Sequence, residues 1–340
     1  MMCSRNALIR FVLVVAVTVV ATHGFVAPKQ LAHNKNPRII SSPQETTPPT
    51  TSYNSVALTI PRGGAALNMA SVETLIIPAL QSGPWGIVAL TGIAAVAVIP
   101  LTLIRQLYSI SVGYGMAIFL AGISLQHAFG LPAKSLGGLI TGGLMFYGLR
   151  LALYLFVREQ TRKTPTAARK EGSIVAKLTL ASSVSLFYAL LSTPAMYALR
   201  NVQALTTSTS LLVTQGGIGV ALCGALLEAT ADLQKYLVKQ SSSSSDESFQ
   251  GPTEWTYRIC RHPNYLGEVL FWAGMFVTGV PSFGTNVVAW IASLLGLYGI
   301  VSIMSKATAR LEEQQQEKYT GQAKYDAWTK QVKSPLVPFL

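Results

Sequence analysis

Long uncharged apolar stretches recur through the middle of the chain and constrain its fold more than any other feature. From Thr74 to Leu227 the only acidic residues are Glu159 and Glu171. An apolar segment of about 20 residues is long enough to cross the ~30 Å hydrocarbon core of a bilayer as a helix. Within lipid the helix also satisfies its own backbone N–H and C=O groups. The sequence therefore predicts an all-α, polytopic helical membrane protein.

The apolar stretches predict about six or seven transmembrane helices. Pro281 and Gly284 interrupt the last stretch, and neither half is much longer than one span. A tight helical hairpin is therefore expected there rather than one long helix. The predicted spans are 86–104, 108–127, 136–157, 174–199, 210–232, 264–281 and 284–305.

The net charge of +12 is distributed unevenly. Basic residues gather in loop 158–173, in loop 233–263 and in the tail after residue 305. Even numbers of spans separate these segments, so all three lie on one side, which the positive-inside rule assigns to the cytosol or stroma. No basic run is interleaved with aromatic residues, so the lipid bilayer is the expected partner and nucleic acid is not.

The first residues have the features of a secretory signal peptide. Arg5 and Arg10 precede a short apolar run, 11–21, and small residues suit a cleavage site before Phe25. The alternative is a first membrane anchor, but this run is short for a span. We therefore expect 1–24 to be a cleaved signal peptide.

Residues 25–72 form a second segment with a different composition. They are rich in Ser, Thr, Pro and Asn, and Glu45 is the only acid from Phe25 to Met69. Such a segment cannot bury a core, which predicts a disordered leader before a membrane domain at 73–340. Together with the signal, this leader resembles the two-part presequence of algae whose plastids lie inside the secretory system. The resemblance implies a plastid membrane, with the endoplasmic reticulum membrane as the alternative.

Ionisable residues inside two predicted spans are candidates for function, because charges at membrane depth are costly. Arg150 and Tyr154 share one face of the third span, and Glu228, Asp232 and Lys235 share one face of the fifth. Two carboxylates four residues apart repel one another unless a cation lies between them. These residues either form an internal ion pair that holds helices together or line a polar, substrate-binding cavity.

The most distinctive motif is Arg-His-Pro-Asn-Tyr-Leu-Gly-Glu at 261–268. Pro263 suits the first position of a helix, which makes His262 the cap residue and leaves an anion-binding helix start. Arg258 and Arg261 would complete a clamp for a phosphate or carboxylate. The alternative is the anchoring of a helix end at the membrane interface by Arg, Trp and Tyr.

Anchoring does not explain the polar residues that follow within the span. Tyr265, Glu268 and Trp272 recur on one helical face, and Asn264 lies beside them. This pattern favours a functional site.

Metal binding and disulfides are not expected. Cys3 lies in the predicted signal, and Cys223 and Cys260 stand alone. The four histidines are scattered, which argues against a zinc site.

Several segments resemble the C-terminal domain of steroid 5-alpha reductase and related bacterial and algal membrane proteins. They are Phe-Tyr-Gly-Leu-Arg-Leu at 146–151, Ala-Asp-Leu-Gln-Lys at 231–235, the stretch 255–268, and the Leu-Glu pair at 311–312. The resemblance covers roughly residues 85–338. Cys260 departs from the family, which usually has Ser there.

The resemblance implies NADPH-dependent reduction of a carbon–carbon double bond in a lipophilic substrate such as a sterol, isoprenoid or other lipid. Hydride transfer requires a cofactor beside the substrate and an acid at the other end of the bond. The expected catalytic residues are Tyr265 as the acid, with Asp232 or Glu268 as its orienter. The expected cofactor residues are Arg258, Arg261, His262, Asn264, Lys235, Trp255 and Tyr257, and the expected substrate residues are Arg150, Tyr154 and Glu228.

Two other functions remain open. Membrane methyltransferases that act on isoprenylated cysteine or phospholipid head groups share an Arg-His-Pro-x-Tyr-x-Gly core, and in them the clamp would hold the carboxylate of S-adenosylmethionine. The segment 232–235 and Asn264 favour the reductase. A non-catalytic lipid binder is the third alternative.

Overall fold

The computed structural model describes residues 69–161, 171–201, 207–241 and 248–337. The predicted signal peptide and nearly all of the predicted leader lie outside these ranges, so both stay predictions. The described residues belong to the compact unit Gly64–Leu340. Within them every regular element is a helix, and seven helices are long and apolar enough to cross a membrane. The predicted all-α, polytopic fold is confirmed.

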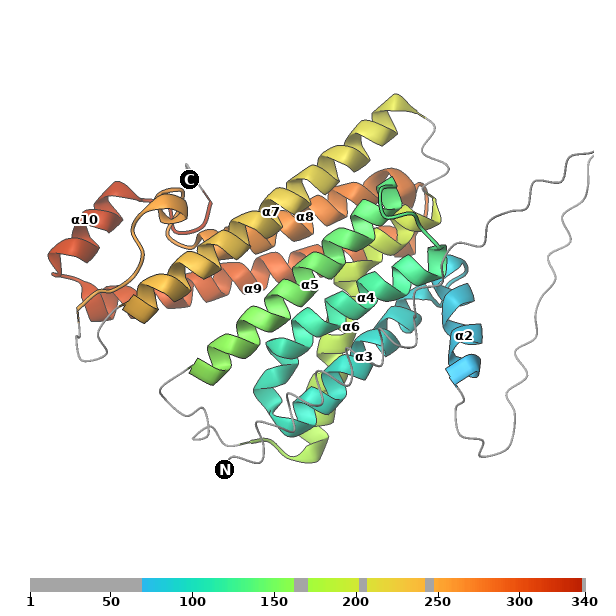
Figure 1. Cartoon of the computed structure of the whole chain (residues 1–340), viewed down its shortest axis with the longest axis horizontal. Coiled ribbons are helices and arrows are strands. Elements are labelled where there is room, and N and C mark those ends of the chain that lie inside the picture. Colours follow the sequence, from blue (N-terminus) through green and yellow to red (C-terminus); the bar gives the residue numbers. More distant parts are fainter. Residues whose placement is uncertain (1–68, 162–170, 202–206, 242–247, 338–340) are drawn as a thin grey trace, which may run out of the picture. The chain divides into compact units, whose positions relative to one another are not determined.

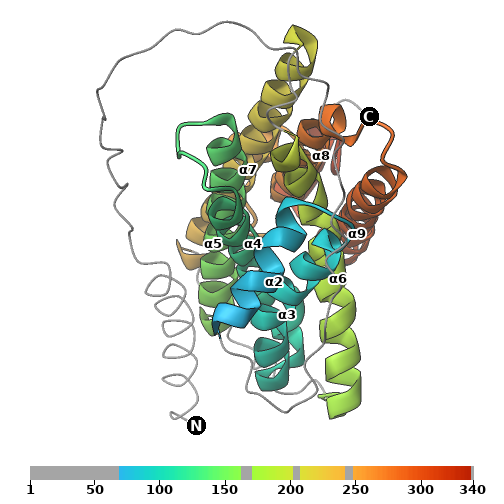
Figure 2. The same ribbon diagram turned by 90° about the vertical axis from the view of Figure 1, so that its right-hand side faces the viewer.

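Figures 1 and 2 show these helices as one bundle. The seven candidate spans are α3 to α9. In chain order the elements are α2 (Met69–Gln81), α3 (Gly86–Ile104), η1 (Gln106–Ile110), α4 (Val112–Phe129), α5 (Leu136–Thr161), α6 (Ile174–Arg200), α7 (Ser208–Ser241), η4 (Trp255–Arg258), α8 (Pro263–Phe283), α9 (Val287–Tyr319) and α10 (Ala323–Gln331).

The predicted spans agree with these helices to within three residues except at four ends. Helix α5 continues past the predicted end at 157, to Thr161. The span predicted to begin at residue 108 begins as the short 3-10 helix η1, and α4 itself starts at Val112. Helices α7 and α9 continue past the predicted ends, to Ser241 and Tyr319. The predictions stopped where the apolar composition stopped, whereas the polar residues beyond are good helix formers and extend both helices.

The hairpin between the last two spans is confirmed. Helix α8 ends at Phe283, and Gly284 follows with a φ of 49°. This left-handed conformation is readily adopted by glycine. The side chain of Asn286 then accepts a hydrogen bond from the N–H of Ala289 and caps α9.

The basic segments meet at one end of the bundle. Arg158 at the end of α5 and Lys235 on α7 are within electrostatic range of one another, and Arg310 on α9 is within range of Tyr265 at the start of α8. Figure 1 shows the C-terminal ends of α5, α7 and α9 on the same side. We call this the basic end. It is the end predicted to face the cytosol or stroma.

Helices α7 and α8 pack against each other through glycines along their length (Figure 1). A Cβ on Gly224 would lie 2.5 Å from the backbone N of Phe271, and one on Gly217 would lie 2.5 Å from the backbone N of Thr278. On α8, a Cβ on Gly267 would lie 2.6 Å from the backbone N of Glu228. Such close helix packing is typical of small residues in membrane proteins. It holds the carboxylates of α7 beside the start of α8.

Gly224→Val should therefore destabilise the protein by about 1–3 kcal/mol, because the new side chain collides with the backbone of α8. The matched control is Gly219→Val on the same helix, where an added Cβ meets no atom within 4 Å. Thermal unfolding of the purified protein in detergent measures both. Equal unfolding temperatures for the two variants would contradict this packing.

A small aromatic module lies at the basic end. Residues of the segment before α8 and of α10 form one buried cluster against Ala231 of α7. The rings of Phe249 and Trp328 stack 5.5 Å apart, and the indole N–H of Trp328 donates to the backbone O of Tyr257. The remaining members are Tyr325 and Val332.

Candidate functional site

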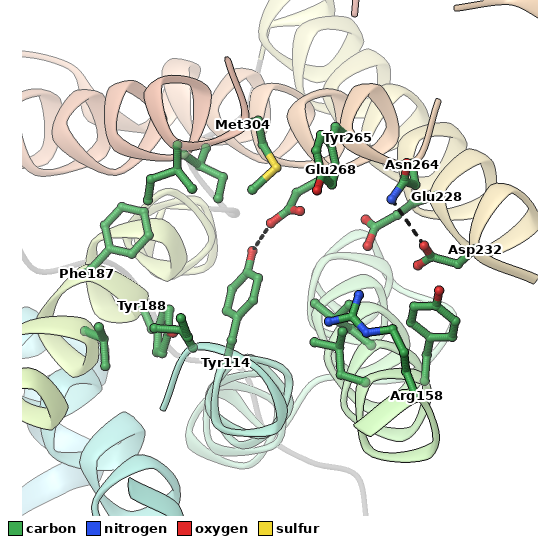
Figure 3. A pocket seen from close by; sticks show the side chains of 17 residues that line it. Tyr114, Arg158, Phe187, Tyr188, Glu228, Asp232, Asn264, Tyr265, Glu268 and Met304 are labelled. Atoms are coloured by element: carbon green, nitrogen blue, oxygen red, sulfur yellow. Dashed lines mark hydrogen bonds between the residues drawn. The ribbon is translucent and has the colours of Figure 1, made fainter. Parts of the chain in front are cut away.

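A cavity of about 470 Å³ lies among α4 to α9, toward the basic end. This volume is within the range of small-molecule sites, about 300–1,000 Å³. One end of the cavity is polar and the other apolar, as Figure 3 shows. Arg158, Glu228, Asp232 and Asn264 lie at the polar end, and Phe187 lies at the apolar end. Tyr114, Tyr188, Tyr265 and Glu268 lie between them. The lining also includes Tyr154 and the apolar residues Val184, Ile300, Ile303 and Met304.

Arg150 holds the two carboxylates of α7. Its Nη2 lies 3.0 Å from Oε1 of Glu228, and its Nη1 lies 3.0 Å from Oδ2 of Asp232. Both carboxylate side chains are buried, with 3% and 7% of their surface exposed. One guanidinium thus relieves the repulsion between two carboxylates on the same helical face. From the sequence, these residues were expected either to form an internal ion pair or to line a polar cavity. Glu228 and Asp232 do both, because the ion-paired carboxylates also line the cavity.

Tyr114 is a hydrogen-bonding centre that the sequence analysis missed. Its hydroxyl accepts a hydrogen bond from Nε1 of Trp272 at 2.6 Å and donates one to Oε1 of Glu268 at 3.0 Å. The hydroxyl of Tyr147 lies 3.3 Å away. Of the predicted face of α8, Tyr265 and Glu268 therefore reach the cavity directly, whereas buried Trp272 reaches it through Tyr114.

Two acceptor atoms at the polar end have no hydrogen-bond partner within the described part of the chain. They are Oδ1 of Asn264 and Oε2 of Glu228. The amide nitrogen of Asn264 donates to Oδ1 of Asp232 at 3.4 Å, which leaves the amide oxygen for another donor. Unpaired buried acceptors cost free energy, so a ligand that donates to them would gain affinity. Lys235, predicted for the cofactor, lies within electrostatic range of Asp232.

Of the seven predicted cofactor residues, Asn264 lines this cavity and the other six do not. The side chain of Trp255 is 85% exposed, and Arg258 pairs with Glu254 on the surface. Tyr257 is buried in the aromatic module. Trp255 and Arg258 therefore lie on the surface, and Tyr257 belongs to the core of the aromatic module. Burial also raises the pKa of the neighbouring Cys260 to about 11, so its thiol stays protonated at neutral pH.

The predicted anion clamp is occupied by a side chain of the protein itself. Nε and Nη2 of Arg261 donate to Oε2 of Glu312 at 2.9 and 2.6 Å. Nε2 of His262 lies 2.7 Å from Oε1 of the same carboxylate. His262 is the residue before α8, as predicted, but its side chain does not cap the helix. In this structure the carboxylate of Glu312 on α9 is the anion beside Arg261, and Arg258 pairs with Glu254 instead.

The segment 332–335 forms hydrogen bonds with the two residues that precede α8. The backbone N–H groups of Arg261 and His262 donate to the carbonyl oxygens of Ser334 and Pro335, each at 3.0 Å. The guanidinium of Arg261 also donates to two further carbonyl groups of the segment 332–335. Arg261 and His262 therefore position α8, whose next turns carry the cavity residues.

Comparison with known proteins shows the family. A family model described as "Protein of unknown function (DUF1295)" matches residues 109–332 of the chain. The chain belongs to the DUF1295 family. No curated protein and no solved structure matches it.

The DUF1295 region contains the whole candidate site. It begins within η1 and ends just after α10, so α2 and α3 lie outside it. Every residue that lines the cavity lies inside it. The same is true of Glu312 and of Val332, the first residue of the tail segment that holds Arg261.

Proposed function

We propose that this DUF1295 protein reduces a carbon–carbon double bond in a lipophilic substrate within the membrane, with NADPH as the reductant. The observation that carries the proposal is the two-ended cavity, which joins a charged end at the basic end of the bundle to an apolar end between membrane spans. The resemblance of residues 255–268 to the steroid 5-alpha reductase C-terminal domain supports the same reaction.

The polar end of the cavity has groups that fit NADPH. The unpaired oxygens of Asn264 and Glu228 are acceptors for an N–H donor such as the carboxamide of a nicotinamide. Arg158, Lys235 and Arg310 are basic residues near this end and would attract phosphate groups. When bound, NADPH would supply the hydride.

The middle of the cavity has groups that can donate a proton to the substrate. Reduction of a double bond adds a hydride to one carbon and a proton to the other, so an acid must lie near the substrate. Tyr265 stays our candidate for this acid, and Tyr114 becomes a second one because Trp272 and Glu268 fix the position of its hydroxyl. Glu268 would orient the acid.

S-Adenosylmethionine is the competing cofactor, and one observation favours it. Three carboxylates, Glu228, Asp232 and Glu268, line the cavity and would attract the positively charged sulfonium and ammonium groups. Against this reading, Arg261, which would hold the methionine carboxylate, is paired with Glu312.

The membrane is the location that the structure supports, and the compartment is part of the proposal. The leader's resemblance to a plastid presequence favours a plastid membrane reached through the secretory pathway, with the endoplasmic reticulum as the alternative.

Thermal unfolding of the purified protein with each cofactor tests the proposal. A ligand at about 100 times its Kd stabilises the folded state by about 2.7 kcal/mol. NADPH should raise the unfolding temperature, and Asn264→Ala should reduce that rise. The control is Gln215→Ala, which removes an exposed amide on α7 far from the basic end. A rise with S-adenosylmethionine alone would indicate a methyltransferase, and no rise with either would indicate a lipid binder.

A further inference from the structure

The apolar end of the cavity reaches the outer surface of the bundle. Ile303 on α9 and Ile110 on η1 both line the cavity, yet 47% and 54% of their surface is exposed. Leu186 of α6 and Leu295 of α9 are apolar and exposed as well. Because α6 and α9 are both candidate spans, this surface faces lipid. The cavity is therefore open to the bilayer beside Ile303.

The inner limit of this apolar end is set where α6 and α9 cross. A Cβ on Gly296 would lie 2.8 Å from the backbone of Leu190, so the two helices touch there. One turn nearer the basic end, Gly299 accommodates the ring of Phe187, from which a Cβ would lie only 2.5 Å away. The ring of Phe187 thus forms the floor of the cavity. In Figure 3 it lies at the opposite end from Asp232.

The charges around the cavity select against an anionic lipid. The three carboxylates of Glu228, Asp232 and Glu268 outnumber the two guanidinium groups there: Arg150 pairs with the first two, and Arg158 also lines the cavity. Glu268 is the one nearest the apolar end. A second negative charge beside a buried carboxylate is repelled strongly. A neutral lipid meets no such repulsion.

We propose that a neutral lipid enters this cavity sideways from the bilayer, between α6 and α9 at Ile303. Its apolar body lies against Val184 and Ile300. The ring of Phe187, which packs against Gly299, limits how far the lipid extends. Its other end lies at Tyr114 and Glu268. That this end is the one reduced rests on the proposed function, whereas the entry route and the floor do not.

Photolabelling in lipid nanodiscs tests the entry route. The probe is a cholesterol analogue that carries a diazirine, and mass spectrometry locates the labelled residues. Label is expected in segments 184–188 and 300–304. Ile300→Trp and Val184→Phe fill the cavity and should each reduce this label several-fold. The control Leu294→Trp adds the same indole to an exposed position of α9 and should leave the label unchanged.

A second probe tests the preference for a neutral lipid, and a second measurement separates the entry route from the proposed reaction. A stearate that carries a diazirine should label these segments several-fold less than the neutral sterol analogue. Equal labelling by both probes, or label unaffected by Ile300→Trp, would overturn the proposal. The shift of the unfolding temperature by NADPH should persist in Ile300→Trp, because the polar end is intact. If wild type shows the expected label but no NADPH shift, the entry route stands and the proposed reaction fails.

Discussion

Arg150→Met should cost the folded protein about 3–5 kcal/mol, the typical penalty for removing one partner of a buried ion pair. The substitution leaves Glu228 and Asp232 buried without the guanidinium that bonds both of them. Arg150→Lys should fall between wild type and Arg150→Met, because a lysine keeps the charge but cannot contact both carboxylates with a rigid fork. Thermal unfolding in detergent gives the order of the three proteins.

Two companion variants show whether charge is the cause. Arg310→Met removes an exposed arginine of α9 and should change stability by no more than about 0.5 kcal/mol. Adding Glu228→Gln and Asp232→Asn to Arg150→Met removes the unpaired charges and should restore part of the loss. If Arg150→Met unfolded at the wild-type temperature, the two carboxyl groups would have to be neutral in the folded protein.

Glu312→Ala should produce a similarly large loss, about 3 kcal/mol, although Glu312 does not line the cavity. Its carboxylate bonds Arg261 and His262 together, and both it and Arg261 are nearly buried, with 12% and 11% of their side chains exposed. Without it, the start of α8 loses the group that joins it to α9. We therefore expect lower stability and a weaker NADPH shift together.

The neighbouring residue provides the control for Glu312. Glu313 is an exposed glutamate one position along the same helix, so Glu313→Ala has the same effect on helix composition without touching Arg261. It should behave as wild type in both measurements. Equal effects of the two substitutions would show that the helix, and not the contact with Arg261, accounts for the loss.

The fold was predictable because its signals are local. The length of an apolar run is sufficient to predict a span, and the break at Pro281 and Gly284 is sufficient to predict a hairpin. The face shared by Glu228 and Asp232 also predicted that a cation must lie between them, and Arg150 was among the candidates.

The site was only partly predictable because its contacts join distant parts of the chain. Nothing near Arg261 in the sequence indicates that its anion is a carboxylate fifty-one positions later, Glu312. Residues 255–261 would have the same basic and aromatic composition whether they bound a ligand or packed in the aromatic module. Tyr114 has no ionisable neighbours at helical spacing, so no periodicity of charged residues marked it. Its role follows from side-chain hydrogen bonds between α4 and α8, which a single sequence does not specify.

The fastening of α8 by residues 332–335 has a consequence for how the protein is made. The helices of a membrane protein are made in chain order, so α3 to α9 precede the carbonyl groups of Ser334 and Pro335 that receive the N–H groups of Arg261 and His262. The start of α8 can therefore be held in its final position only after every candidate span has been made. Until then the growing chain has no finished site with which to capture a cofactor or a lipid.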